Sequence, residues 1–193
     1  MHQLEPFYNW REKYVPEKDR RSPFFGRTYN DAVCTNKIYN YYIHPRWDDF
    51  GSSTLYMKAL YLNYDQGYAI LEMMGEWNDA IHNDIMFLKR DVIEAMQEEG
   101  INKFILICEN VLNFHSSDDL YYEEWADELE GGWICMINTF DHVAEEMEHI
   151  RLQHYVHFGR NFNDINWRLH KPGLLFQLLD GTIKGETKGV SRF

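Results

Sequence analysis

Between Tyr68 and Ile150 the sequence alternates short apolar runs with longer amphipathic stretches, and this alternation limits the fold more than any other feature. The apolar runs 68–74, 104–108 and 133–137 have the length and composition of buried strands. Each run is followed by a stretch with helical periodicity. The order strand, helix, strand, helix, strand, helix is typical of parallel strands joined by right-handed crossovers. The sequence therefore predicts an α/β fold.

One further strand is expected just before this repeat. Residues 54–64 are rich in aromatic and aliphatic side chains, and Asp65-Gln66-Gly67 separates them from the run at 68–74. Two such runs around a short turn predict a β-hairpin. We therefore expect a mixed sheet of about four to five strands, with the helices mainly on one face.

The clearest predicted helix covers residues 79–99 and ends at Gly100. A second helical stretch, 117–130, follows two serines that are able to cap it. Apolar residues of the first helix recur every three or four positions, which predicts one buried stripe. The members of this stripe are Ile81, Ile85, Leu88, Val92 and Met96.

A third helix is predicted at 140–150, where the side chain of Thr139 is expected to cap the first turn. A shorter helical stretch is expected at about 163–170. Residues 181–193 are expected to form a flexible C-terminal tail. The main domain would then span residues 53–180.

Residues 1–52 differ in composition from the rest of the chain. They contain four of the five prolines, which deny helices and sheets a backbone donor, so an irregular extension is expected. The extension is also rich in Tyr, Trp and Phe, unlike a disordered tail. We expect it to wrap the main domain or to form a dimer contact, with one short strand at 37–43.

Negative charge is concentrated in the second half of the chain. The net charge is −12, and residues 109–150 contain 12 acidic residues and no Lys or Arg. Such a surface repels a phosphate backbone and anionic lipids, which argues against a nucleic-acid or membrane partner. It is either a solvated face that aids solubility or a docking face for a basic protein partner.

The cysteines and the chain ends indicate a reducing cytoplasm. Cys34, Cys108 and Cys135 are odd in number and widely spaced, so neither a disulfide framework nor a zinc knuckle is expected. The chain has no apolar run long enough to span a bilayer. Its first residues lack the basic start and apolar core of a secretory signal.

Three stretches resemble the STAS family, which is named for sulfate transporters and anti-anti-sigma factors. Gly75-Glu76 follows the second strand as a Gly-Glu does in that family. Residues 104–117 (FILICENVLNFHSS) resemble its stretch from an apolar strand to the Asp-Ser-Ser that opens a helix, and 131–137 (GGWICMI) resembles its Gly-Gly strand. The resemblance covers roughly residues 54–170 and implies a STAS-like sheet.

In anti-anti-sigma members a partner kinase phosphorylates the second serine and thereby switches partner binding. The resemblance places that role on Ser117, with Ser116 beside it. His115 stands where the family has Asp, and Asp118 stands where it has Gly. A phosphate at a helix start would meet free N–H groups, although Asp118 and Asp119 would repel it. The alternative is that both serines are plain helix caps.

Other residue clusters give weaker indications of a binding site. Glu146 and His149 share a helix face, and His154 and His157 lie nearby, but a metal site needs three or four converging ligands. No metal or cofactor is therefore predicted. Trp77, at the junction of strand and helix, either lines a site at the strand ends or packs in the core.

Taken together, these features predict a non-enzymatic regulatory or scaffolding domain of bacterial-type signalling that acts through protein contacts. One alternative is a domain that binds a nucleotide or lipid in a pocket between the aromatic extension and the sheet. A metal-dependent enzyme is the third possibility. The expected partner-contact residues are Trp77, His115, Asp118, Asp119 and Glu123.

Overall fold

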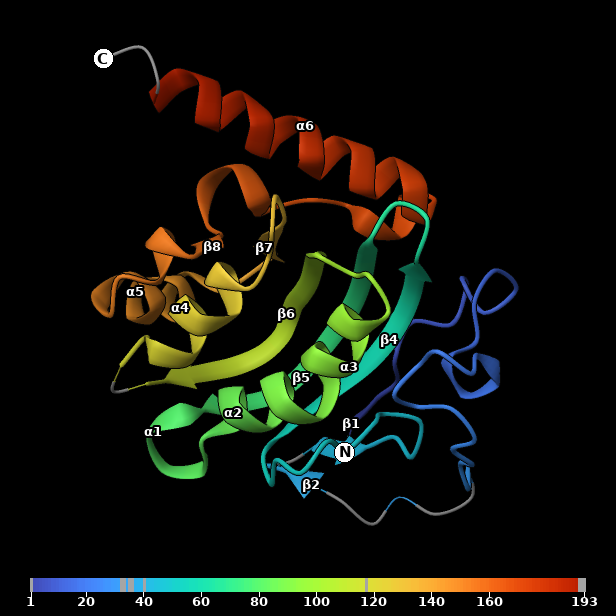
Figure 1. The fold of residues 1–193 in the computed structure, drawn as a ribbon. Helices are drawn as coiled ribbons and strands as arrows, with labels where there is room; N and C mark the ends of the chain where they lie inside the picture. Colours follow the sequence, from blue (N-terminus) through green and yellow to red (C-terminus); the bar gives the residue numbers. More distant parts are fainter. Residues whose placement is uncertain (1, 32–33, 35–36, 40, 117, 191–193) are drawn as a thin grey trace.

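The computed structural model describes residues 2–31, 34, 37–39, 41–116 and 118–190, and its larger sheet has the strand order β4-β5-β6-β7-β8 (Figure 1). β4 is antiparallel to β5, and all other neighbours are parallel. The prediction of an α/β fold with a mixed sheet is confirmed. The strands are β4 Leu55–Asn63, β5 Tyr68–Asn78, β6 Lys103–His115, β7 Trp133–Ile137 and β8 Val156–His157.

The predicted hairpin is present as β4 and β5. Its turn contains Gly67, whose φ of 67° is a left-handed conformation that glycine adopts without strain. The carbonyl oxygen of Gly67 accepts from the N–H groups of Asn102 and Lys103, which ties the turn to the start of β6. The hairpin and the first parallel strand are therefore joined at one end of the sheet.

Two layers of helix cover the sheet, and the second was not predicted. Helices α2 to α5 bury their apolar residues on one face, together with Leu71, Leu106 and Met136. Helix α6 packs on the opposite face against Ile105 and Ile137. The helices are α1 Asp79–His82, α2 Asp84–Leu88, α3 Glu94–Glu98, α4 Leu120–Asp127, α5 Asp141–His149 and α6 Pro172–Val190.

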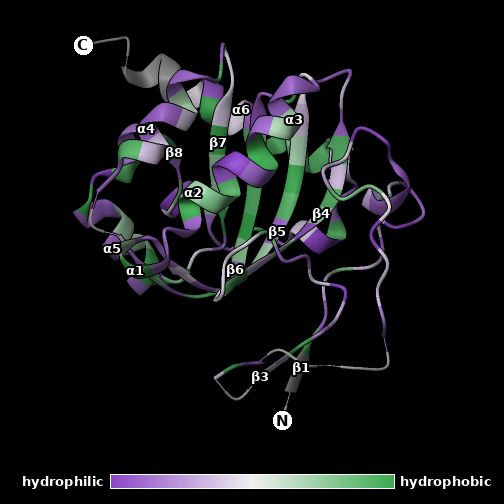
Figure 2. Ribbon diagram, turned by 60° about the horizontal axis from the view of Figure 1, so that its bottom comes forward, coloured by the Kyte–Doolittle hydropathy of each residue, from purple (hydrophilic) through white to green (hydrophobic). Residues whose placement is uncertain are grey.

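Helix α6 corrects two predictions about the C-terminal region. The flexible tail expected from residue 181 is helical as far as Val190, and residues 163–170 contain only a short 3-10 turn, Trp167–Leu169. The physical reason lies in the sheet. Residues 104–108 of β6 and all of β7 are continuously hydrophobic and bury side chains on both faces of the sheet, so each face needs a covering layer; both segments are largely green in Figure 2.

The predicted helix at 79–99 is divided into α1, α2, a π-helical turn at Lys89–Ile93, and α3. Asn83 separates the first two pieces because it adopts a left-handed conformation with φ of 56°. The stripe from Ile85 to Met96 is buried as predicted. Ile81 is not part of it: the break at Asn83 leaves the Ile81 side chain 78% exposed.

Two predicted capping side chains, Ser116 and Thr139, do not cap their helices. Helix α4 begins at Leu120 rather than 117, and the Ser116 hydroxyl donates to the Asp118 carbonyl; the described N-cap residue of α4, Asp119, forms no side-chain cap. Thr139 likewise donates its hydroxyl to Asn163 Oδ1 at 3.2 Å, and α5 has no side-chain cap. The strand expected at 104–108 continues as β6 to His115, because its second half pairs with β5.

The N-terminal region forms a second, three-stranded sheet in the order β1-β3-β2. This sheet packs through Ile38, Ile43 and Trp47 against Tyr56 of β4 and Met74 of β5. Residues between β1 and β2 cross the α6 face of the large sheet, where Trp10 is buried. Its strands are β1 His2–Leu4, β2 Lys37–Ile38 and β3 Tyr41–Ile43.

Candidate functional site

A cleft of about 280 Å³ opens where β5 and β6 end, between α1 and the start of α4. In Figure 1 the arrowhead of β6 points into the space between these two helices. Carboxyl ends of parallel strands are the usual place for ligands in open α/β sheets. The residues that line the cleft are Asp79, Ala80, Ile81, Asn83, Ile85, Ser116, Asp118, Leu120, Tyr121 and Tyr122.

Asp79 is the most strongly held polar group of the cleft. Its Oδ1 accepts from Trp77 Nε1 at 3.0 Å and from the Ile85 N–H at 2.8 Å. Its Oδ2 accepts from the Tyr122 hydroxyl at 2.6 Å, which joins α1 to α4. Burial raises the pKa of Asp79 to about 7, with a further contribution from the charge of Asp84, although the three donors oppose the rise.

Asp84 stabilises the same turn through a hydrogen bond to its backbone. Its side chain is fully buried, and Oδ2 accepts from the Asn78 N–H at 2.7 Å. The Asn78 side chain in turn accepts from the N–H of Ile81, as the N-cap of α1. Burial raises the pKa of Asp84 as well. The two acids thus fix the turn that leads from β5 into α1.

Two apolar side chains stand at the mouth of the cleft with little cover. Ile81 of α1 is 78% exposed and Leu120 of α4 is 64% exposed. The lining residues just before Leu120 in the chain, Ser116 and Asp118, are polar. The cleft therefore combines apolar side chains with carboxyl groups, and a partner with both apolar and cationic groups fits that combination.

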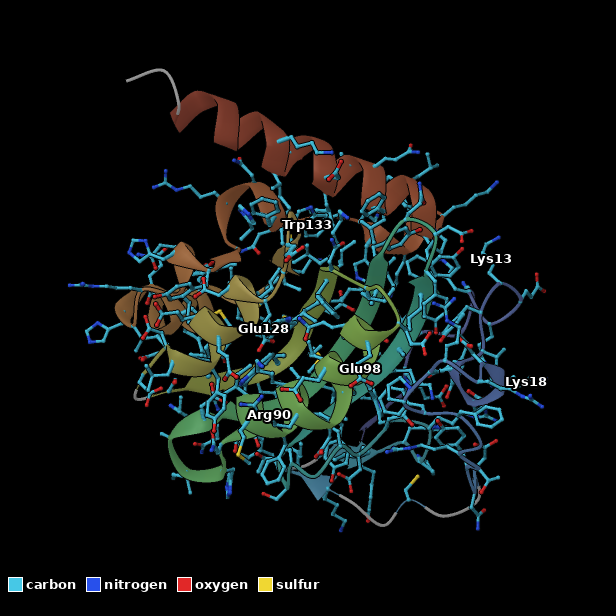
Figure 3. The ribbon with its side chains drawn as sticks, viewed as in Figure 1. Lys13, Lys18, Arg90, Glu98, Glu128 and Trp133 are labelled. Carbon is cyan, nitrogen blue, oxygen red and sulfur yellow. The ribbon has the colours of Figure 1, made fainter. Side chains whose placement is uncertain are left out.

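A buried lysine connects the two helical regions that frame the cleft. Lys89, in the π-helical turn, lies within 3.2 Å of carboxylates from Glu94, Glu124 and Glu128. Burial lowers the pKa of Lys89, but its three acidic partners raise it more, so the net shift is upward. Arg90 adds an ion pair to Glu124, and Figure 3 shows Arg90 and Glu128 on the two facing elements.

The acidic face of α4 is accordingly only partly solvated. Glu124 and Glu128 are held by cations from the preceding helical region, whereas Glu123 and Asp127 are exposed. The sequence could not show this pairing, since Lys89 is 35 or more residues distant in the chain. The acidic side chains that remain available to a partner lie at the start of α4 and along its outer side.

The predicted partner-contact residues lie in different environments, some exposed and one fully buried. His115, at the end of β6, and Asp118 are exposed, and Asp119 occupies the N-cap position of α4. Ser116 lines the cleft, whereas Ser117 lies outside the described residues. Trp77 is fully buried against Phe114 and Tyr122, which excludes it as a contact residue and agrees with core packing.

The predicted metal candidates are not assembled. Glu146 and His149 are exposed on α5, and His154 lies in the turn after it. His157 is on β8. In the part of the chain that the structure describes, no three His, Cys, Asp or Glu side chains come together as a metal site. The histidine and glutamate pairs therefore give no support to a metal-dependent enzyme.

A ligand pocket between the N-terminal region and the sheet was the predicted alternative, and one narrow hollow lies in that place. The hollow lined by Trp10, Tyr14 and Lys58 has only about 10 Å³ of free space, which is room for a single water molecule. A wider, shallow cleft of about 560 Å³ lies at the end of β7, but its Asn138 and Asn163 side chains already hydrogen-bond across the loops.

Sequence reasoning did not identify Asp79, Tyr122, Ile81 or Leu120 as site residues. One signal was available for Asp79, since it is the first carboxylate after the strand β5. No signal marked Leu120, because an apolar residue at a helix start is ordinary.

Among the described residues, no helix is long and apolar enough to cross a bilayer. No known family model matches the chain, and no curated protein matches it either. The STAS resemblance therefore stays a prediction.

Proposed function

We propose that this chain is a STAS-like, non-enzymatic regulatory domain of the cytoplasm that binds a protein partner at the cleft between α1 and α4. One observation carries the proposal: Ile81 and Leu120, two strongly exposed apolar side chains, line a single cleft together with the carboxyl groups of Asp79 and Asp118. Scattered exposed apolar residues need no explanation, but apolar residues that share a cleft are typical of an interaction site.

The charge around the cleft defines the partner. The stretch 109–150, which supplies half of the cleft lining and all of α4 and α5, contains no Lys or Arg. A basic segment would be attracted and oriented by this field, and one or two of its apolar side chains would bury Ile81 and Leu120. The proposed partner is therefore a basic amphipathic segment of another protein.

Phosphorylation of Ser117 would regulate the same site. Ser117 lies in the sequence between Ser116 and Asp118, which both line the cleft. A phosphate adds a charge of about −2 and would strengthen the attraction for a basic segment. The switch in anti-anti-sigma members, which the sequence resembles, works through this position.

The test is a titration of the ¹⁵N-labelled full chain with a synthetic amphipathic peptide of alternating Lys and Leu clusters. We expect shifts in the amide signals of α1 and of the start of α4. The variants Ile81→Ser and Leu120→Ser should each weaken binding about tenfold, because each removes one apolar anchor. Ser117→Glu should strengthen it about threefold.

The matched control is Leu174→Ser, since Leu174 is 55% exposed on α6, on the other face of the sheet. It should bind like the unchanged chain. All three serine variants should alter the free energy of unfolding by less than about 0.5 kcal/mol, because the side chains are exposed. Equal loss of binding in Leu174→Ser and Leu120→Ser, or shifts spread over every acidic surface, would contradict the proposal.

A further inference from the structure

A second buried carboxyl group, Glu72, lies far from the cleft, on the α6 face of the sheet. It is in the middle of β5 and has no exposed surface. Oε2 accepts from the N–H of Phe7 at 2.8 Å. Among the described residues, Oε1 has no hydrogen-bond partner. A carboxyl group buried with a single neutral donor is unusual, because a buried charge is normally paired.

The charged groups that face Glu72 do not neutralise it. Lys58 is its register partner on β4, but the Lys58 ammonium donates to Asp48 at 2.9 Å and to Tyr29 at 2.8 Å. Glu109 on β6 adds like charge. Arg168 is held by both oxygens of Glu109, so its charge is largely balanced there. Glu72 is therefore left with the Phe7 N–H.

That donor belongs to a segment that lies across the sheet. Residues 5–15, called the strap here, contain Phe7 and the buried Trp10. The rings of these two residues contact each other at 5.4 Å between centroids. They also contact the Trp167 ring, at 4.8 Å from Phe7 and 5.6 Å from Trp10. These ring contacts hold Phe7, whose N–H bonds to the fully buried Glu72, on the sheet.

We propose that the strap is a proton-controlled latch, closed over the sheet when Glu72 is protonated and released when Glu72 ionises. A neutral carboxyl group is buried at modest cost, and one oxygen still accepts from Phe7 N–H. An ionised group beside Glu109 gains more from water than from one amide donor, and only movement of the strap admits water. Release would uncover the aromatic rings and the carboxylates of Glu72 and Glu109. The latch is independent of the cleft.

The direction of the pH effect follows from burial. Desolvation raises the pKa of Glu72 from 4.5 to about 7 in the closed protein, the Phe7 N–H opposes this rise, and Glu109 adds to it. With water admitted, the pKa returns toward its ordinary value. The closed strap is therefore most stable below about pH 4.5, and it loses stability as pH rises through 7.

Hydrogen exchange of the full chain at pH 5.5 and 7.5, corrected for intrinsic rates, tests this latch. The strap amides of Arg11, Lys13 and Tyr14, which hydrogen-bond within the strap, report on opening together with the Phe7 amide. We expect the opening equilibrium constant to be roughly tenfold larger at pH 7.5 than at pH 5.5. Amides in the middle of β6 should not show this increase.

Glu72→Gln keeps an acceptor for Phe7 but removes the ionisable group, so its strap opening should be the same at both pH values. Glu98→Gln, at an exposed position labelled in Figure 3, should behave like the unchanged chain. Equal pH dependence in Glu72→Gln and the unchanged chain would overturn the proposal. So would parallel changes in the strap and β6, which indicate global unfolding.

If Glu72→Gln does not fold, the carboxyl carbon of Glu72 in the unchanged chain can be titrated by NMR. A midpoint near pH 7 supports the latch, and a midpoint below about pH 5 overturns it.

Discussion

Glu72, fully buried in strand β5, and Asp79, half-buried where that strand ends, both have a pKa raised to about 7 by burial, yet their surroundings are opposite. Asp79 receives three donors, from Trp77, Ile85 and Tyr122. Glu72 receives one, from Phe7, and among the described residues its second oxygen has none. The pKa alone therefore does not say what a buried acid does in the structure.

The difference lies in what each acid holds together. Asp79 joins β5, α1, α2 and α4 around the cleft, so the elements there depend on its oxygens. Glu72 holds one backbone amide of the strap and faces Glu109, so its ionisation works against the segment that covers it. Asp79 therefore holds several elements together. Glu72 weakens the closed strap when it is ionised and stabilises it when it is protonated.

The largest expected effect on stability comes from removing Asp79, the acid that has three hydrogen-bond donors. Asp79→Ala should lower the free energy of unfolding by about 3 kcal/mol at pH 7, because three donors lose their acceptor and all three belong to buried residues. Urea denaturation measures this change. Asp118→Ala, at an exposed residue of the same cleft, should change stability by less than about 0.5 kcal/mol. A loss below about 1 kcal/mol in Asp79→Ala would show that water replaces its oxygens.

The second expected effect is the pH dependence of the free energy of unfolding, to which Asp79 and Glu72 both contribute. Each has a pKa raised in the folded state, so each contributes stability that is full below its unfolded pKa and is lost as pH rises through about 7. We expect the free energy of unfolding to fall by about 3 kcal/mol between pH 5 and pH 8. Glu72→Gln should reduce this fall and be more stable than the unchanged chain at pH 8. Stability that rises over this range would contradict the comparison.

The smallest effect comes from removing one of the three donors of Asp79. Tyr122→Phe should cost about 1 kcal/mol, since it deletes one hydrogen bond and leaves the packing with Trp77 in place. Because the Tyr122 hydroxyl lowers the pKa of Asp79, the variant should raise that pKa above 7. Carboxyl titration by NMR measures the shift. Tyr121→Phe, at the half-buried neighbour in the same cleft, is the control and should change neither quantity.

Local patterns predicted the elements whose residues are close in sequence. The hairpin at Gly67, the strand 133–137 and the buried stripe from Ile85 to Met96 were all confirmed, because period and turn chemistry act over a few residues. The prediction failed where a single backbone conformation changes the direction of the chain. Asn83 ends α1 in this way and turns Ile81 outward.

The capping predictions for Ser116 and Thr139 failed for a similar reason. Ser116 and Thr139 have side chains able to cap a helix, but a hydroxyl bonds to whichever partner the fold brings nearest. That partner is the Asp118 carbonyl for Ser116, and Asn163, 24 residues away, for Thr139. Helix α6 was missed because its apolar positions are separated by three glycines up to residue 185, which lower helix propensity. Packing on the second face of the sheet stabilises it nonetheless.

The sequence by itself determined the α/β class, the hairpin, the buried strands and the concentration of acidic residues from 109 to 150, since each follows from composition or short-range periodicity. Only the tertiary structure decided which of those acids are paired, that Ile81 and Leu120 line one cleft, and that Glu72 is buried while Asp79 is half-buried among three donors. Each carboxyl group has a hydrogen-bond donor from a distant part of the chain. Tyr122 lies 43 residues from Asp79, and Phe7 lies 65 residues from Glu72. Long-range packing, which no local pattern encodes, sets the chemistry of both carboxyl groups.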